Sequence, residues 1–239
     1  MIIDYDDIAI SYDALVQQDV KQSTFPYSGY QKIQDLILED IVSRDKKPRI
    51  LDLGCGTGLL YQLINPSQLH LVGVDGSLKM LEIAKKRYPQ GEFYLHDLYK
   101  GLPIKVLNQS YDFIIINYVC MHFNFKTCLD LIQQLSKRLK PHGKIIISDL
   151  LFMNPECKQT FFANYPEYAN LNLYFHIYGH FVNQMKQQMA LSFFEINSYT
   201  GMMIIENVND FTLLFEDPLV KYKSNTEKWR STHPQRNSE

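Results

Sequence analysis

The chain has 239 residues, of which 46% are hydrophobic and 21% are charged, as is typical of a globular protein with one large core. Its net charge of −2 gives no electrostatic reason to expect a nucleic-acid partner, because binding phosphates requires a basic surface. There is no apolar run long enough for a membrane span, no signal-peptide pattern, and no metal-ligand spacing among the four cysteines. We therefore expect one cytoplasmic domain with reduced cysteines, no membrane partner and no metal.

Two helical segments are expected before the first strand. Residues 1–22 carry apolar side chains at helical spacing, and a second helix is expected over residues 30–42. Turn-forming residues separate the two segments, and Lys46-Lys47-Pro48 breaks the chain before the first strand.

The first expected strand, residues 50–53, runs into three glycines at alternate positions: Gly54, Gly56 and Gly58. Glycine suits such a turn because the backbone adopts conformations that a Cβ opposes, and because a ligand can then approach the peptide groups closely. We expect a helix over residues 58–64, whose first N–H groups would face polar parts of that ligand. The pattern predicts a cofactor loop at the end of a buried strand.

Further strands alternate with helices along the next 90 residues. Acidic residues follow two of these strands, Asp75 after residues 71–74 and Asp97 after residues 93–95. Two more strands are expected over residues 111–117 and 143–149, and helices over residues 78–88 and 127–139. In open α/β folds the ligand binds at the carboxyl edge of the parallel sheet, where these polar residues would gather.

Taken in order, these motifs resemble the class I S-adenosylmethionine-dependent methyltransferases, and most closely the small-molecule branch called type 11 or type 25. The resemblance covers roughly residues 30–150 and rests on residues 51–58, Asp75 with Ser77 and Met80, Asp97 before Gly101-Leu102-Pro103, Tyr111-Asp112 with His122, and residues 139–143.

This resemblance implies an α/β fold with a doubly wound, mostly parallel seven-stranded sheet, helices on both faces and a helical cap. The expected domain spans residues 1–222, with its core at about 30–150 and 183–217, its cap at about 150–182, and a polar, disordered tail at 223–239. The implied cofactor is S-adenosylmethionine, with S-adenosylhomocysteine as product. The implied partner is a small-molecule acceptor, and the oligomeric state stays open.

The resemblance also assigns roles to single residues. Asp75 would bind the ribose hydroxyls, and Asp97 would accept from the adenine amine, although Asp52 and Asp97 could instead be ordinary caps or turn formers. Tyr12 would close over the cofactor, unless it only packs in the core. The full set of expected cofactor-binding residues is Tyr12, Asp52, Gly54, Cys55, Gly56, Gly58, Asp75, Gly76, Ser77, Met80, Asp97, Leu98, Asn117 and Tyr118.

Two histidines are the candidate catalytic residues. His122 follows the fourth strand, and the ordinary histidine pKa near 6.5 suits a general base. His176 lies in the expected cap, within a stretch of nine aromatic residues between positions 150 and 182. These rings would either line an acceptor pocket or pack as an extra layer of core.

Three other functions compete with a small-molecule methyltransferase. A nicotinamide-dependent dehydrogenase is disfavoured because its fingerprint needs a glycine or alanine where Leu59 stands. A DNA methyltransferase is disfavoured because Asn117-Tyr118 lacks the two prolines of the base-amine motif and no Pro-Cys nucleophile is present. An RNA or protein methyltransferase, and a non-catalytic S-adenosylmethionine-binding protein, remain as alternatives.

Overall fold

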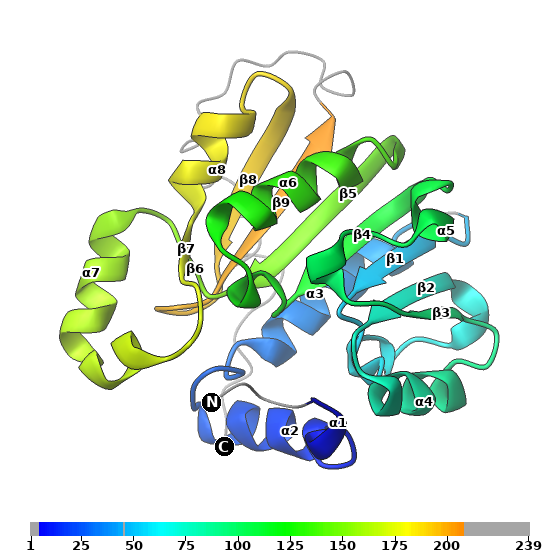
Figure 1. The fold of residues 1–239 in the computed structure, drawn as a ribbon, viewed down its shortest axis with the longest axis horizontal. Helices are drawn as coiled ribbons and strands as arrows, with labels where there is room; N and C mark the ends of the chain where they lie inside the picture. The colour runs from blue at the N-terminus through cyan, green and yellow to red at the C-terminus, as the bar shows by residue number, and fades with distance from the viewer. Residues whose placement is uncertain (1–4, 45, 208–239) are drawn as a thin grey trace.

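A seven-stranded sheet in the order β3-β2-β1-β4-β5-β9-β8 crosses the molecule (Figure 1). The computed structural model describes residues 5–44 and 46–207. The first five strands of this order pair in parallel, and β9 and β8 pair antiparallel. The strands are β1 (Arg49–Leu53), β2 (His70–Asp75), β3 (Glu92–Leu95), β4 (Tyr111–Asn117), β5 (Leu139–Asp149), β8 (Met189–Glu195) and β9 (Gly201–Asn207). The predicted seven-stranded, mostly parallel sheet is confirmed.

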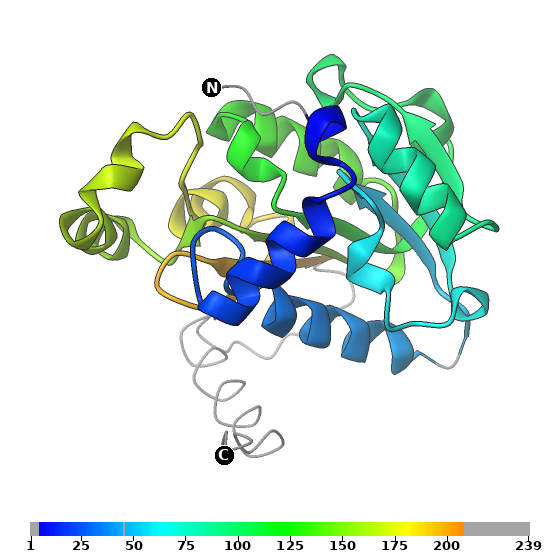
Figure 2. The ribbon, with the colours of Figure 1, turned by 90° about the horizontal axis from the view of Figure 1, so that it is seen from below.

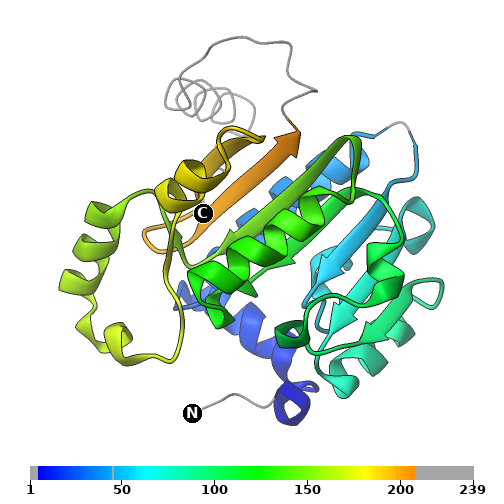
Figure 3. The same cartoon turned by 45° about the horizontal axis from the view of Figure 1, so that its top comes forward.

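Helices cover both faces of this sheet. One hydrophobic cluster joins one face to α5, α6 and α8, and a second cluster joins the other face to α3. Figure 3 shows α6 in front of the sheet and α3 behind it. The α-helices are α1 (Tyr5–Ile8), α2 (Tyr12–Gln22), α3 (Tyr30–Val42), α4 (Leu78–Arg87), α5 (Ile104–Leu107), α6 (Phe125–Ser136), α7 (Pro155–Asn164) and α8 (Tyr178–Met185).

The prediction of a helix over residues 58–64 is wrong. Only the 3-10 turn Leu59–Tyr61 follows the glycine loop. The buried Gln34 of α3 donates from Nε2 to the carbonyl oxygens of Leu59 (3.0 Å) and Leu60 (2.9 Å). In an α-helix these carbonyl groups would accept from N–H groups later in the chain. Here they accept from the Gln34 side chain, which lies 25 positions before Leu59, and no α-helix forms.

The cap contains more than helices. Between β5 and α8 lie α7, the 3-10 segment Pro166–Asn170, and a two-stranded parallel sheet of β6 (Leu151–Phe152) and β7 (His176–Ile177). Figure 1 shows α7 beyond the end of β5, to the left of the main sheet. The expected tail at 223–239 and the expected domain end at 222 lie outside the described residues.

The N-terminal helices lie across the carboxyl edge of the sheet. Figure 2, seen from below, shows α1 and α2 crossing the ends of the parallel strands. Any ligand at that edge is therefore covered by residues 5–22 as well as by the strand ends.

Candidate active site

The glycine loop after β1 holds all three glycines in the left-handed region, with φ of 68° at Gly54, 52° at Gly56 and 74° at Gly58. A Cβ at Gly54 would lie 2.3 Å from Val119 Cγ2, and one at Gly58 would lie 2.9 Å from the Tyr88 ring. At Gly56, apart from the glycine itself and its two chain neighbours, no atom of the described residues lies within 4 Å of that position. Gly54 and Gly58 are therefore needed for packing, whereas Gly56 faces open space.

Asp75, the last residue of β2, fixes this loop from the side. Its carboxylate accepts from the backbone N–H of Gly56 and from that of Ser77, each at 2.8 Å. Burial raises the pKa of the carboxyl group, and the backbone N–H groups oppose that rise. Because an ionised carboxylate offers about four acceptor sites, Asp75 keeps capacity for hydroxyl donors from a ligand.

The floor of the site is a small pocket between the glycine loop and β4. At its edge, the Oδ1 atom of Asn117 is buried and has no hydrogen-bond partner among residues 5–44 and 46–207. Asp52 is 2% exposed, and burial raises its pKa. A buried oxygen without a donor fits a ligand that brings one. The lining residues are Tyr12, Tyr30, Asp52, Gly54, Cys55, Gly56, Thr57, Leu59, Leu60 and Asn117.

The residues expected near adenine lie at the ends of β2 and β3. Ser77 is the N-cap of α4 and accepts from the backbone N–H of Met80 at 3.1 Å. Asp97 is exposed, caps the 3-10 turn Leu98–Lys100 and accepts from the Tyr99 N–H at 3.0 Å. The capping role considered for Asp97 is thus present, and its role toward adenine stays a prediction. Gly76 lies beside this edge, and an added Cβ there would lie 3.9 Å from the His96 carbonyl oxygen.

His122 lies in the 3-10 turn Cys120–His122 that follows β4. Its Nε2 atom lies 3.0 Å from the Tyr5 hydroxyl, and the two rings meet edge to face at 5.8 Å. Burial lowers the pKa of His122. The imidazole is therefore neutral near pH 7, the form that can accept a proton.

His176 lies elsewhere. It is 5% exposed in β7, and its Nε2 donates to the Cys120 carbonyl at 2.9 Å. The side chain joins the cap to the turn that carries His122, and it lines a cap cavity rather than the pocket beside the glycine loop.

A cluster of five tyrosines stands over the site, and the sequence motifs predict only two of its members, Tyr12 and Tyr118. Tyr12 meets Tyr5 at 6.3 Å and Tyr27 at 5.9 Å between ring centroids. Tyr118 meets Tyr27 at 5.0 Å and Tyr30 at 6.2 Å, and its φ of 56° is rare for a residue with a bulky side chain. Tyr5 and Tyr27 carried no local signal, because their partners lie on distant segments.

Asp149, the last residue of β5, was also missed. It is fully buried, and its carboxylate accepts from the N–H of Leu150 at 2.7 Å and of Met121 at 3.1 Å. Burial raises its pKa to about 7. An acid directly after an apolar strand is the pattern that identified Asp75, so this signal was present in the sequence.

Two acidic residues of the N-terminal helices hold those helices on the site. Asp6 accepts from Ser77 Oγ at 2.5 Å and from the Lys79 N–H at 3.1 Å. Asp13 accepts from Thr57 Oγ1 at 2.5 Å and pairs with Arg87 at 2.7 Å. Arg87, the last residue of α4, therefore connects α4 to α2.

Comparison with known proteins defines the class. Residues 28–193 match a family model described as a methyltransferase domain. An uncharacterized methyltransferase of Oceanobacillus iheyensis is 31% identical over 157 residues, which are 65% of this chain and 70% of that protein. A demethylmenaquinone methyltransferase of Thermotoga maritima is 32% identical over 149 residues, 62% of this chain and 60% of that protein.

Solved structures agree with this fold. The magnesium protoporphyrin IX methyltransferase of Synechocystis PCC 6803 with bound S-adenosylhomocysteine superposes with a TM-score of 0.58 at 18% identity, covering 80% of this chain and 86% of that one. The chain therefore belongs to the class I S-adenosylmethionine-dependent methyltransferases, and it is an enzyme whose cofactor is S-adenosylmethionine.

Two further features bear on the expectations from composition. None of the helices in the described part of the chain is long and apolar enough to cross a membrane. The four cysteines are free, and three of them (Cys55, Cys120 and Cys128) are buried, whereas Cys157 is exposed.

Proposed function

We propose that this enzyme methylates a small-molecule acceptor held between the tyrosine cluster and the cap. The observation that carries the proposal is the enclosure of the carboxyl edge. Helices α1 and α2 cover it from one side, and the cap segment 173–177 packs against the Cys120–His122 turn on the other. An enclosed edge suits an acceptor that enters the site completely, whereas a nucleic acid or protein chain needs an open path.

The residues of the edge fit S-adenosylmethionine. The open space at Gly56 allows a ligand to approach the backbone, and the unpartnered Asn117 oxygen suits an ammonium donor such as that of the methionine moiety. Asp75 would accept from the ribose hydroxyls. When bound, the cofactor supplies a methyl group on a positively charged sulfur.

The remaining work of the protein is to place the acceptor, exclude water and take up a proton. In our proposal the tyrosine cluster excludes water, because its rings pack edge to face over the strand ends. His122 accepts the proton, since its imidazole is neutral and lies in the turn at the end of β4. We assign this step to His122 rather than His176, because His176 lines the cap cavity and not the pocket beside the glycine loop.

The experiment follows tritium from methyl-labelled S-adenosylmethionine into three fractions of a cell extract: small molecules, RNA and protein. We expect the label in the small-molecule fraction. His122→Asn should lower turnover by about 100-fold, the size expected for losing a general base, and should leave S-adenosylhomocysteine affinity unchanged.

The matched control is His70→Asn, at the opposite end of β2, which should retain full turnover. Label confined to RNA or protein would overturn the small-molecule acceptor, and unchanged turnover in His122→Asn would overturn the role of His122. Cytoplasmic location stays a prediction from the sequence. The oligomeric state stays open.

A further inference from the structure

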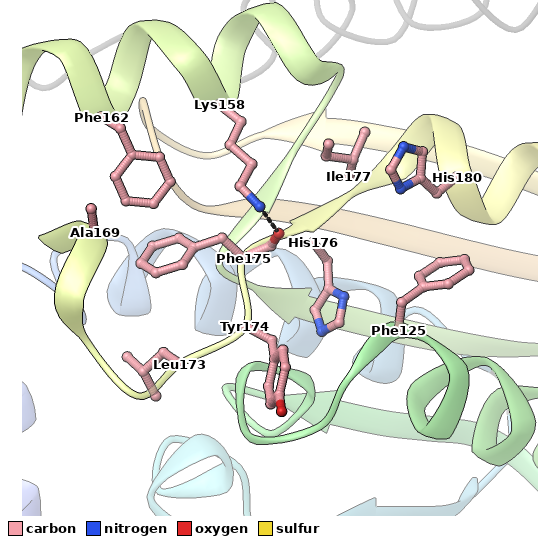
Figure 4. Close-up of a pocket in the computed structure, with 10 residues that line it drawn as sticks. All are labelled: Phe125, Lys158, Phe162, Ala169, Leu173, Tyr174, Phe175, His176, Ile177 and His180. Carbon is pink, nitrogen blue, oxygen red and sulfur yellow. Dashed lines mark hydrogen bonds between the residues drawn. The ribbon is translucent and has the colours of Figure 1, made fainter. Parts of the chain in front are cut away.

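The cap contains two cavities, one on each side of α7, and they differ in charge. The larger has a volume of about 430 Å³ (Figure 4), within the range of small-molecule sites. Its lining residues are Phe125, Lys158, Phe162, Ala169, Leu173, Tyr174, Phe175, His176, Ile177 and His180. The smaller cavity, about 390 Å³, is lined in part by Glu156 and Glu195.

The larger cavity is lined largely by aromatic side chains, and the charged or chargeable nitrogen groups in its lining are basic. Lys158, His176 and His180 contribute its nitrogen atoms, and no aspartate or glutamate is among its lining residues. Figure 4 shows the Lys158 side chain reaching down from α7, and its Nζ donates to the Phe175 carbonyl at 2.7 Å. An ammonium group has three donors, so Lys158 keeps two after that bond.

The position of Lys158 favours an anion. Burial lowers the pKa of this lysine, which means that its charge is incompletely solvated in the absence of a partner. Lys158 forms no salt bridge with an acidic side chain among the described residues. An anion beside the ammonium would supply the missing partner, and charge-assisted hydrogen bonds of this type are about twice as strong as neutral ones.

The cavity also lies against the turn that carries His122. The Tyr174 N–H donates to the Met121 carbonyl at 2.8 Å, and His176 donates to the Cys120 carbonyl at 2.9 Å. One wall of the cavity is therefore bonded directly to the segment at the end of β4. A molecule in the cavity would lie on the cap side of the same turn whose other end meets Tyr5.

We propose that this cavity binds a carboxylate group of an acceptor with an apolar body, with Lys158 as its counter-ion and the rings of Phe162 and Phe175 around the apolar part. This inference rests on the proposed function, because it identifies the chemical class of the acceptor. It adds a residue, Lys158, that no sequence motif identified.

The test measures binding to the full chain loaded with S-adenosylhomocysteine. The probes are 2-naphthoate and octanoate, each compared with its own primary amide, which has nearly the same shape and no charge. We expect each carboxylate to bind at least about 10-fold more tightly than its amide. Lys158→Met should remove this preference, and Lys158→Arg should retain it.

The matched control is Lys186→Met, which changes an exposed lysine at the end of α8 outside the cavity lining and should leave the preference intact. Equal affinities of carboxylate and amide in the wild type, or no binding of either, would overturn the inference, and this contrast needs no variant to fold. S-adenosylhomocysteine affinity is measured in the same samples. Absence of S-adenosylhomocysteine binding would count against the proposed function. Binding of S-adenosylhomocysteine without a carboxylate preference would count against the cap cavity alone.

Discussion

The cofactor edge and the cap hold their side chains by different means. At the edge, carboxylates accept from backbone N–H groups only a short distance away in space, as Asp75 does from Gly56 and Ser77. In the cap, rings stack on rings from remote segments, as Tyr168 does on Phe25 at 4.3 Å between centroids. The cofactor edge therefore depends on a few fixed backbone positions, whereas the cap depends on the sum of many apolar contacts. Single substitutions should therefore act sharply at the edge and gradually in the cap.

The largest effect is expected at Gly56. Gly56→Val fills the open space beside the loop and forces a side chain into the left-handed region, so S-adenosylhomocysteine affinity should fall by about 100-fold or more. Calorimetry measures the affinity and circular dichroism the fold. Gly101→Val is the matched control, because Gly101 also has positive φ and open space but lies outside the pocket lining. Equal losses in both variants would show that backbone strain, not ligand approach, explains the result.

Asp149 lies where the two regions meet, and we expect Asp149→Asn to lower the free energy of unfolding by about 1–3 kcal/mol. The amide can accept from only one of the two N–H groups that the carboxylate now serves, and its own N–H₂ faces the other. Chemical denaturation provides the measurement.

The same residue predicts a pH dependence. Its pKa is about 7 in the folded protein and 3.8 ordinarily, so the folded state holds a proton that the unfolded chain releases between those values. The free energy of unfolding of the wild type should therefore fall, relative to Asp149→Asn, as pH rises from about 4 to about 7. Parallel stability curves for the two proteins across this range would contradict the assignment.

A smaller effect is expected at Asp75. Asp75→Ala should weaken S-adenosylhomocysteine binding by about 10-fold, because it removes the acceptor for the ribose hydroxyls and the bond to the Gly56 N–H. Calorimetry compares it with Asp130→Ala, which removes an exposed carboxylate of α6 paired with Lys126 and should keep full affinity. Retention of full affinity in Asp75→Ala would remove the ribose assignment.

The smallest effect on the cofactor is expected from the cap. Tyr168→Ala removes the stack on Phe25 and should accelerate amide hydrogen exchange across residues 155–177, which we expect to exceed that of the central strands already in the wild type. S-adenosylhomocysteine affinity should change by less than about twofold, within the range of distant independent sites. A large loss of affinity would mean that the cap and the edge form one cooperative unit.

The fold and the loop geometry were predictable because they depend on local patterns. Strand, glycine turn and acid recur in order, and each alternation places a polar group at the same sheet edge. The positive φ values at Gly54, Gly56 and Gly58 confirm the expected turn. Six of the fourteen residues expected at the cofactor line one pocket, although their roles toward the ligand stay predictions: Tyr12, Asp52, Gly54, Cys55, Gly56 and Asn117.

The remainder depended on contacts between distant segments. Gln34 interrupts the helix expected after the loop by bonding to Leu59 and Leu60, and nothing near those residues in the sequence announces it. Tyr5 and Tyr27 join the site only because α1 and the segment after α2 fold back over the strands. The cap cavity likewise combines α6, α7 and β7, so its basic lining could not be read from any single stretch.

The contact between Asp6 and Ser77 has a kinetic consequence. Ser77 begins α4, beside the position expected for the adenosine, and Asp6 bonds both to its hydroxyl and to the Lys79 N–H. We expect exchange of spent for fresh cofactor to require α1 to lift from α4 in every cycle, because these bonds hold α1 over that position. Because such opening steps limit turnover in many enzymes, we expect product residence time, rather than the methyl transfer itself, to set the maximal rate.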